Sequence, residues 1–333
     1  MFKIVAYGVR ENEVPFFEKL NRYNYDLKLL PEYLNHDNID TAKGADAVLL
    51  RANCVADATN LAKMKDWGIK YVFTRTVGFN HIDLAAADAN GQLVARVPSY
   101  SPNAVADLAL TLGLTLQRHV AFAAYHSQAK DFRVLPEEFS SEIRNLTVGI
   151  IGTGHIGIAE ARSYQALGAK VLGYDIYQSD EAKEVVTFVE QADLLAQADI
   201  VSLHVPYIKG ENDRFINADL LKLMKPTAIL VNTARAEVTN VADIVAALQA
   251  GKLGGFAADV IDDEKDYLGK NLQDQPIKNA DLAALIDLYP RVILTPHIGS
   301  YTKEALTDMI NISYDNFNEV LTTGTSKNLL HAK

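Results

Sequence analysis

The sequence contains almost none of the residues that build cross-links. Its 333 residues include one cysteine, Cys54, which excludes an internal disulfide and a cysteine-based metal cluster. We therefore predict no metal site, and such a chain is typical of a reducing compartment. No histidine lies near Cys54 in the sequence to activate it, so we interpret this residue as a packing residue and not as a nucleophile.

Long apolar runs and basic clusters are also missing. The longest apolar candidate, near Leu108–Leu116, is interrupted by threonine and glycine and is too short to span a bilayer. The chain has 42 acidic and 32 basic residues, a formal net charge of −10, and no long run of Lys or Arg. We therefore predict no binding to nucleic acid or to an anionic membrane surface. Residues 2–7 read as a first strand instead of a secretory signal, so we expect a cytoplasmic protein.

The apolar residues that are present suffice for two domain cores. Hydrophobic residues make up 49% of the 333 positions. Over the first 100 residues, short apolar runs alternate with amphipathic helical stretches, which predicts an α/β domain with a parallel sheet. The expected strands are Ile4–Tyr7, Leu27–Leu30, Ala47–Leu50, Tyr71–Thr74 and Leu93–Val97.

A second, doubly wound sheet of about six strands is expected after residue 147. One of its predicted helices covers Phe188–Ala196. The final helix, Thr302–Leu321, lies beyond the last strand, and we expect it to return to the first domain. Pro98 and Pro102 mark the crossing between the domains. The predicted domains are residues 1–100 together with 300–333, and residues 101–299.

A glycine-rich turn gives the strongest local signal. The turn Gly152-Thr153-Gly154-His155-Ile156-Gly157 follows an apolar strand and opens a helix, and Asp175 ends the next strand. In such a βαβ unit the glycines allow a sharp turn, close approach of a pyrophosphate, and close packing of helix on strand. The helix start offers free N–H groups to the anion. Because Asp175 can bind ribose hydroxyls and would repel a 2′-phosphate, we predict NAD as the cofactor instead of NADP.

Four polar residues end apolar runs of the second domain. They are His204, Arg235, Asp259 and His297, and Glu264 follows Asp259 in an acidic loop. Ligands of open α/β sheets bind at the carboxyl ends of the strands. We therefore take these five residues as candidate site residues.

Together these segments resemble the D-isomer-specific 2-hydroxyacid dehydrogenases, close to the branch of D-lactate, D-2-hydroxyisocaproate and D-2-hydroxyglutarate dehydrogenases. The resemblance covers essentially the whole chain. It rests on Thr153–Gly157, His204–Pro206, Asn232–Arg235, Asp259–Val260 with Glu264, and Thr295–His297. It implies two doubly wound α/β domains, a Rossmann NAD-binding domain and a flavodoxin-like substrate domain, with an active-site cleft between them.

The resemblance implies an NAD-dependent oxidoreductase that reduces a 2-oxo acid stereospecifically to the D-2-hydroxy acid. Arg235 would bind the substrate carboxylate bidentately and help to polarise the carbonyl. His297 would be the acid in reduction and the base in oxidation, since imidazole titrates near the working pH. Glu264 would accept a hydrogen bond from the other imidazole nitrogen and favour the charged form.

The resemblance also assigns residues to the cofactor and to the substrate. Asp259 would bind the nicotinamide carboxamide, and Tyr100 would lie near the substrate. The backbone N–H groups of Val77 and Gly78 would meet the substrate carboxylate. The expected cofactor-binding residues are Gly152, Gly154, His155, Ile156, Gly157, Asp175, His204, Val205, Pro206, Thr233 and Asp259.

Structural roles are the alternatives for some of these residues. His204 could be a buried structural histidine, Asp259 a turn cap, and Tyr100 a packed turn residue. The chain also departs from the common family pattern at Asp107, Ala236, Ile261 and Asp262. These departures leave every expected catalytic group in place and bear on loop details and substrate preference.

Arg51 is the residue that we expect to determine substrate preference. The segments Leu49–Cys54, Leu288–Arg291 and His297–Thr302 resemble the 2-hydroxyglutarate branch more than the others. Arg51 follows a strand of the first domain and could pair with the distal carboxylate of 2-oxoglutarate. The alternative is an arginine satisfied within its own domain, with a D-lactate, D-2-hydroxyisocaproate or phenyllactate dehydrogenase as the result.

A different class of function is an NAD-sensing regulatory protein, because relatives of this fold serve as NAD-responsive corepressors. The presence of Arg235, Glu264 and His297 argues against pure sensing. Formate oxidation is disfavoured, because an uncharged partner for the histidine is expected there. The family is usually dimeric through its nucleotide domains, so we expect a homodimer that acts on a small 2-oxo or 2-hydroxy acid.

Overall fold

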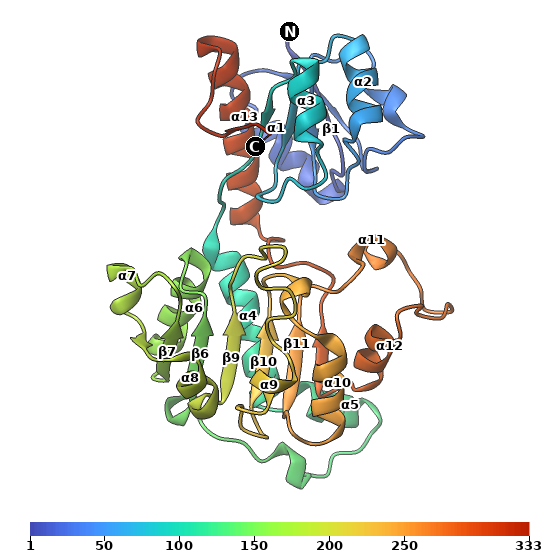
Figure 1. The fold of residues 1–333 in the computed structure, drawn as a ribbon. Helices are drawn as coiled ribbons and strands as arrows, with labels where there is room; N and C mark the ends of the chain where they lie inside the picture. The colour runs from blue at the N-terminus through green and yellow to red at the C-terminus, as the bar shows by residue number, and fades with distance from the viewer. Residues whose placement is uncertain (333) are drawn as a thin grey trace. The chain divides into compact units, whose positions relative to one another are not determined.

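The computed structural model describes residues 1–332. The chain divides into two compact units (Figure 1). Unit 1 contains Met1–Ser101 and the chain from Tyr301 onward, and unit 2 contains Pro102–Ser300. Each unit has a parallel β-sheet with helices between successive strands, so the predicted α/β class is confirmed.

Unit 1 is built on a four-stranded parallel sheet in the order β2-β1-β3-β4. The strands are β1 (Lys3–Ala6), β2 (Asp26–Leu29), β3 (Ala47–Leu50) and β4 (Tyr71–Thr74). All four residues of β3 are buried, because a central strand with helices on both faces has no solvent side. The helices of this unit are α1 (Val14–Leu20), α2 (Ala58–Asp66), α3 (Leu84–Asn90) and α13 (Lys303–Thr323).

Helix α13 packs within unit 1, although it is far from the other elements in the sequence. Its residues Ile310, Tyr314 and Phe317 belong to the same buried cluster as Phe73 of β4. The rings of Phe317 and Phe73 stack with their centroids 4.4 Å apart. The apolar stripe of this helix is therefore buried against the sheet, as its helical spacing predicts.

The strand predicted at residues 93–97 differs from the expectation. Leu93 forms a single parallel bridge with Tyr71. The following strand, β5 (Val94–Ala95), then pairs antiparallel with β13 (Leu329–Leu330). Because β13 itself spans only two residues, this pairing remains short.

Unit 2 contains a seven-stranded parallel sheet in the order β12-β11-β10-β9-β6-β7-β8. The strands are β6 (Thr147–Ile151), β7 (Lys170–Tyr174), β8 (Thr187–Phe188), β9 (Ile200–Leu203), β10 (Ile229–Asn232), β11 (Gly255–Ala258) and β12 (Val292–Leu294). The strand order reverses between β6 and β9, and ligands of such sheets bind at this switch point. The helix expected at residues 188–196 begins only at Gln191, because Phe188 belongs to the edge strand β8.

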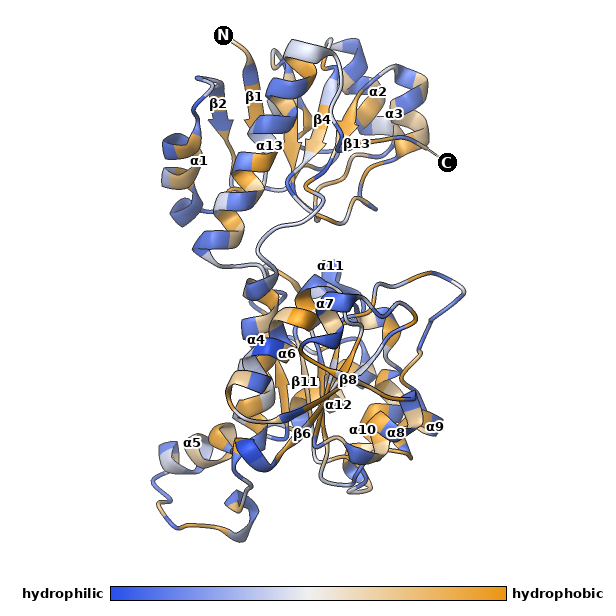
Figure 2. Ribbon diagram, turned by 90° about the vertical axis from the view of Figure 1, so that its left-hand side faces the viewer, coloured by the Kyte–Doolittle hydropathy of each residue, from blue (hydrophilic) through white to orange (hydrophobic). Residues whose placement is uncertain are grey.

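Helices cover both faces of the sheet in unit 2 (Figure 1). They are α4 (Pro102–Gln117), α5 (Val120–Gln128), α6 (His155–Ala166), α7 (Asp180–Lys183), α8 (Gln191–Gln197), α9 (Ala218–Leu221), α10 (Val241–Gln249), α11 (Glu264–Tyr267) and α12 (Ala280–Asp287). Residues of α4 and α6 form one buried cluster with the sheet, and residues of α8, α9, α10 and α12 form the other. The hydropathy colours in Figure 2 accordingly show apolar strands beneath helices of mixed character.

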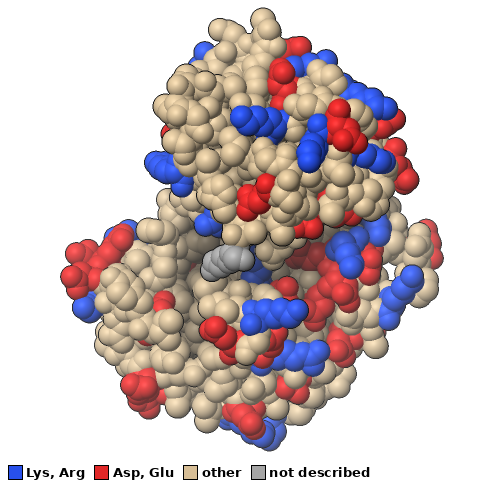
Figure 3. All heavy atoms as spheres, turned by 45° about the horizontal axis from the view of Figure 1, so that its top comes forward, with Lys and Arg blue, Asp and Glu red and all other residues tan. Residues whose placement is uncertain are grey.

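The helices and the surface charges of the described residues bear on contact with membranes and other molecules. Within residues 1–332, every helix is too short or too polar to cross a bilayer. On the face shown in Figure 3, Lys and Arg side chains are interspersed with Asp and Glu side chains. Charges of both signs are therefore mixed on that face.

Candidate active site

The glycine turn between β6 and α6 has the geometry of a pyrophosphate-binding turn. Gly152 has φ +95°, and a Cβ there would lie 2.7 Å from the backbone of His204. A Cβ on Gly157 would lie 2.1 Å from the carbonyl oxygen of Gly152. Space around Gly154 is open, and this residue caps α6 without a side chain. The N–H groups of the first turn of α6, at His155 and Ile156, can therefore be approached by an anion.

Asp175 lies directly after β7 and is anchored on the glycine turn. One oxygen of its carboxylate accepts a hydrogen bond from the backbone N–H of Thr153 at 2.6 Å, and the other accepts one from the N–H of Tyr177 at 3.0 Å. This places a fixed negative charge next to the turn. The arrangement fits a diphosphate at the helix start and a ribose at the carboxylate.

His204 lies at the end of β9 with its side chain turned inside. The imidazole is 2% exposed and contacts a carboxylate oxygen of Glu160 on α6 at 2.5 Å. The backbone of His204 instead abuts Gly152, and Val205 and Pro206 follow it. Contact between His204 and a cofactor would therefore come from the backbone, and its role in binding stays a prediction.

Thr233 is a further residue whose surroundings fit a bound dinucleotide. Its hydroxyl is buried and has no hydrogen-bond partner within residues 1–332. Buried polar groups are normally satisfied, so an unpaired hydroxyl after β10 is available to a ligand. Together with the glycine turn and Asp175, this residue fits a dinucleotide at the carboxyl edge of the sheet.

The structure brings Glu264 and His297 into contact. Nδ1 of His297 lies 3.0 and 2.9 Å from the two carboxylate oxygens of Glu264. His297 follows β12 with a left-handed backbone, φ +53°, and Glu264 begins α11 in the loop after β11. Because Nδ1 is occupied, Nε2 of the imidazole remains for a substrate.

Opposing influences act on the pKa of His297. Burial is the largest single influence and lowers this pKa, whereas the hydrogen bond and the charge of Glu264 raise it. The charge of Asp259 raises it further, whereas the charge of Arg235 lowers it, and the net pKa is above the ordinary histidine value. The imidazole therefore holds its proton at higher pH than a free histidine would, which suits a group that donates a proton in reduction.

Arg235 follows β10, and a buried asparagine orients its backbone. The side-chain amide of Asn232 donates to the carbonyl of Arg235 at 2.8 Å, and its oxygen accepts from the N–H of Ala234 at 3.0 Å. The guanidinium itself is exposed and uses one N–H on the carbonyl of Ala234 at 2.7 Å. Within residues 1–332, most donors of this guanidinium thus have no partner and can bind an anion.

Asp259 lies at the end of β11 and is 2% exposed. Its carboxylate accepts hydrogen bonds from the hydroxyl of Thr295 at 2.5 Å and from the N–H groups of Ile298 at 2.8 Å and Gly299 at 2.7 Å. Burial raises the pKa of this carboxyl despite these bonds. Asp259 thus fixes the loop that carries His297, and its contact with a nicotinamide stays a prediction.

The other expected substrate residues lie in unit 1. Val77 and Gly78 follow β4, and their N–H groups make no hydrogen bond within the described part of the chain. Tyr100 is partly buried just before the end of the first segment of this unit. The roles of these residues stay predictions.

Arg51 follows β3 and contacts groups of its own unit. It donates to the carbonyl of Gly8 at 3.4 Å, and its guanidinium lies 3.8 Å from a carboxylate oxygen of Glu13. Glu13 binds the fully buried Arg75 more closely, at 2.9 Å, and also Arg10 at 3.2 Å. Arg51 thus has the longest contact of the three arginines around this carboxylate.

Sequence reasoning missed two residues that organise the site. Asn232 is the polar last residue of the buried strand β10, and this position is the signal that could have identified it. Thr295 gave a similar signal at the end of β12, where its hydroxyl binds Asp259.

Comparisons with known proteins agree with this geometry. Residues 110–299 match the family model described as D-isomer specific 2-hydroxyacid dehydrogenase, NAD binding domain. The chain belongs to this family. As a member of this family, the protein is an NAD-dependent oxidoreductase that acts on the CH–OH group of 2-hydroxy acids.

Individual relatives span nearly the whole dehydrogenase chain. A D-lactate dehydrogenase of Lactiplantibacillus plantarum is 37% identical over 327 residues, 97% of each chain. An aromatic 2-oxoacid reductase of Clostridium sporogenes is 35% identical over 328 residues, 98% of each chain. A crystal structure of a D-isomer-specific 2-hydroxyacid dehydrogenase from Lactobacillus delbrueckii ssp. bulgaricus in its NAD-complexed form has a TM-score of 0.86 and 32% identity, covering 98% of this chain and 100% of that one. The predicted family and cofactor are thus confirmed.

Proposed function

We propose that the protein reduces a 2-oxo acid to the D-2-hydroxy acid with Arg235, Glu264 and His297 as its catalytic residues. When bound, NADH supplies the hydride that adds to the carbonyl carbon. The observation that carries the proposal is the contact of His297 Nδ1 with Glu264 at 2.9 Å, which leaves Nε2 to donate a proton to the carbonyl oxygen. In the oxidative direction, the same nitrogen accepts the proton of the hydroxyl group.

Arg235 holds the substrate in this proposal. Its exposed guanidinium follows β10, and its charge acts on His297. A guanidinium pairs with a carboxylate through two parallel hydrogen bonds and also stabilises negative charge that develops on a neighbouring carbonyl oxygen. Val77 and Gly78 add backbone N–H donors to the carboxylate, since these groups have no partner within residues 1–332.

The finer proposal concerns the substrate, for which we propose a dicarboxylic 2-oxo acid such as 2-oxoglutarate. Three arginines share the single carboxylate of Glu13, and Arg51 is the one with the longest contact. Burial lowers the pKa of Arg51, and the neighbouring charge of Arg75 lowers it further. A guanidinium that is poorly compensated in this way gains stability from a second carboxylate.

The contacts of Arg51 also support a competing substrate class. If the carbonyl of Gly8 and the carboxylate of Glu13 satisfy the guanidinium of Arg51, it does not bind a distal carboxylate. Pyruvate or an aromatic 2-oxo acid is then preferred. The names of the relatives, a D-lactate dehydrogenase and an aromatic 2-oxoacid reductase, favour this alternative.

The test is kcat/KM for 2-oxoglutarate, pyruvate, 2-oxoisocaproate and phenylpyruvate in wild type and in Arg51→Met. Loss of the charged partner should cost about 2 kcal/mol for 2-oxoglutarate alone. A wild type that prefers phenylpyruvate, with the same ranking in Arg51→Met, would refute the dicarboxylate proposal and leave the dehydrogenase assignment intact.

We further propose that unit 2 carries a homodimer interface. Helix α5 has an apolar composition but no buried residue. The segment after it exposes Phe132, Val134 and Phe139, the last at 92%. Figure 2 shows α5 and this segment projecting from the rest of unit 2. A monomer rarely exposes so many large apolar side chains together, so we assign this face to a second copy of the chain.

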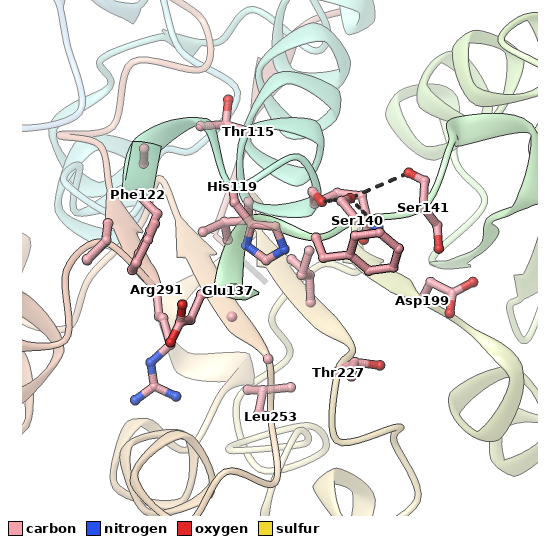
Figure 4. Close-up of a pocket in the computed structure, with 18 of the residues that line it drawn as sticks. Thr115, His119, Phe122, Glu137, Ser140, Ser141, Asp199, Thr227, Leu253 and Arg291 are labelled. Carbon is pink, nitrogen blue, oxygen red and sulfur yellow. Dashed lines mark hydrogen bonds between the residues drawn. The ribbon is translucent and has the colours of Figure 1, made fainter. Parts of the chain in front are cut away.

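A pocket beside α5 belongs to the same proposed interface. It lies at the amino-terminal edge of the sheet, and its wall includes His119, Phe122, Phe139, Leu253 and Arg291 (Figure 4). Sedimentation equilibrium should give a dimer for wild type and a monomer for Phe132→Glu. A wild type that is monomeric at micromolar concentration would contradict the proposal.

A further inference from the structure

Arg96 connects the C-terminal segment of the chain with the loop that follows β4. Its backbone N–H donates to the carbonyl of Asn328 at 3.2 Å, and its carbonyl accepts from the side-chain amide of Asn316 at 3.0 Å. Asn316 lies on α13 and is buried. The backbone of Arg96 is therefore held on both sides by residues distant in sequence, and its partly buried side chain starts from a fixed position.

The side chain of Arg96 makes two contacts with the loop. Its Nη1 donates to the carbonyl oxygen of Val77 at 3.0 Å. Its guanidinium carbon lies 5.3 Å from the ring centroid of Phe79, within the range of a cation–π interaction. One side chain thus holds the loop on either side of Gly78.

The bond to Val77 determines where the N–H group of Gly78 points. A trans peptide is planar, so its carbonyl and N–H groups point in opposite directions. Because Arg96 holds the carbonyl of the Val77–Gly78 peptide, the N–H of that peptide points away from Arg96. A hydrogen bond to the carbonyl also polarises the peptide and makes its N–H a stronger donor, and a cationic donor increases this effect.

Thr76 holds the next peptide in a similar way. Its hydroxyl donates to the carbonyl oxygen of Gly78 at 2.7 Å and lies 2.8 Å from the hydroxyl of Thr74. Two consecutive carbonyl groups are therefore anchored, whereas the N–H groups of Val77 and Gly78 are left without partners within residues 1–332. This pattern is that of a backbone site prepared for an anion.

We propose that Arg96 is a positioning residue for the carboxylate of the 2-oxo acid. It acts through the Val77–Gly78 peptide, which it orients and polarises, and it does not contact the substrate itself. The inference rests on the proposed function, in which Val77 and Gly78 bind this carboxylate. Arg96 would thus hold the loop in its binding conformation before the acid binds.

The test compares Arg96→Met and Arg96→Lys by steady-state kinetics. Arg96→Met keeps a long apolar stem but removes the donor and the charge, and it should raise KM for the 2-oxo acid about tenfold, since a charge-assisted hydrogen bond is lost. KM for NADH should stay within about twofold of wild type, because unit 2 is unchanged. Arg96→Lys retains a donor for the carbonyl of Val77 and should recover most of the loss.

Arg22→Met is the matched control. Arg22 lies in the same unit and binds Asp315 at the surface, without a contact to the loop. It should leave both KM values unchanged. An unaltered KM for the 2-oxo acid in Arg96→Met, an equal rise in both KM values, or an Arg96→Lys variant as poor as Arg96→Met would each overturn the inference. Failure of the proposed function is distinguishable, because wild type would then turn over no 2-oxo acid.

Discussion

Glu13 in unit 1 and Glu264 in unit 2 each bind a cationic side chain, and the two pairs differ in environment. In unit 1, Glu13 binds Arg75 at 2.9 Å, and both side chains are 2% exposed. In unit 2, Glu264 binds His297 at 2.9 Å, and the imidazole is 42% exposed. An arginine stays charged at any working pH, whereas a histidine gains and loses its proton near neutrality. The first pair therefore holds structure together, and the second can perform acid–base chemistry.

The two carboxylates also respond differently to their surroundings. Burial by itself raises the pKa of Glu13, but the charges of Arg75 and Arg51 and the hydrogen bonds from Arg75 and Arg10 together outweigh it, and the net pKa lies below the ordinary value. In the other unit, burial lowers the pKa of His297, but the hydrogen bond and charge of Glu264, together with the charge of Asp259, raise the net pKa above the ordinary value. At similar distances, Glu13 and Arg75 thus form a permanent ion pair, whereas the partner of Glu264 is a histidine that can gain and lose a proton.

The largest effect is expected when the pair of Glu13 and Arg75 is broken. Glu13→Gln leaves Arg75 buried without a counter-charge and should lower the free energy of unfolding of unit 1 by about 3 kcal/mol. The single tryptophan, Trp67, lies in unit 1 and reports its unfolding in urea through fluorescence. The matched control is Asp315→Asn, which breaks the exposed pair with Arg22 and should cost less than about 1 kcal/mol.

The same pair has a pH signature. Because the folded pKa of Glu13 is depressed, its contribution to stability is present above the unfolded pKa and is lost as the pH falls through the folded pKa. Wild type should therefore lose stability on acidification more steeply than Glu13→Gln. Parallel stability curves for the two proteins between neutral and acidic pH would show that Glu13 is not the ionised partner of Arg75.

The next change breaks the pair that we propose as catalytic, Glu264 and His297. His297→Gln should reduce turnover by at least about 100-fold, because the lost function is proton transfer. NADH binding, measured by the fluorescence of the reduced cofactor, should be largely unchanged, since the glycine turn and Asp175 are intact. Near-normal turnover in His297→Gln would show that another group donates the proton.

A smaller effect concerns cofactor choice in unit 2. Asp175→Ala removes the charge anchored at the glycine turn and should raise the ratio of NADPH to NADH kcat/KM about tenfold. The comparison variant is Asp175→Asn. Its side-chain amide oxygen still accepts a hydrogen bond from the N–H of Thr153, so the glycine turn keeps its position while the charge is lost. Equal use of both cofactors by wild type at subsaturating concentrations would contradict the role given to Asp175.

The smallest expected effect is a shift of the pH–rate profile in Glu264→Gln. His297 must be protonated to donate in reduction, so the reductive rate falls as pH rises through its pKa. Glu264→Gln removes the charge that raises this pKa, and the alkaline limb of the reductive profile should move to lower pH. Oxidation needs the neutral imidazole and should extend to lower pH in the same variant. An unmoved profile would show that Glu264 does not set the pKa.

Sequence reasoning was strongest where function depends on residues at strand ends. The glycine turn, Arg235 and His297 each follow an apolar run, and parallel strands bring such positions to one edge of the sheet. The contact of His297 with Glu264 agrees with what the family resemblance implies for this pair. The α/β class followed from the alternation of strands and helices for the same reason.

The remaining features depend on contacts that no local pattern encodes. Arg51 and Arg75 share Glu13, and the sequence separation of 62 positions between Glu13 and Arg75 hides this competition. Helix α3 was missed because its sequence is rich in alanine and carries little apolar periodicity, and its start depends on the cap that Asp83 provides to the N–H of Ala86. The two-residue strand β8 is defined only by its pairing with β7.

The proposed reaction is tested most directly by steady-state oxidation of NADH with a panel of 2-oxo acids, followed by chiral analysis of the product. We predict that one molecule of D-2-hydroxy acid forms for each NADH consumed, and that His297→Gln binds NADH but forms almost no product. NADH binding by wild type without turnover of any 2-oxo acid, or formation of the L-isomer, would contradict it.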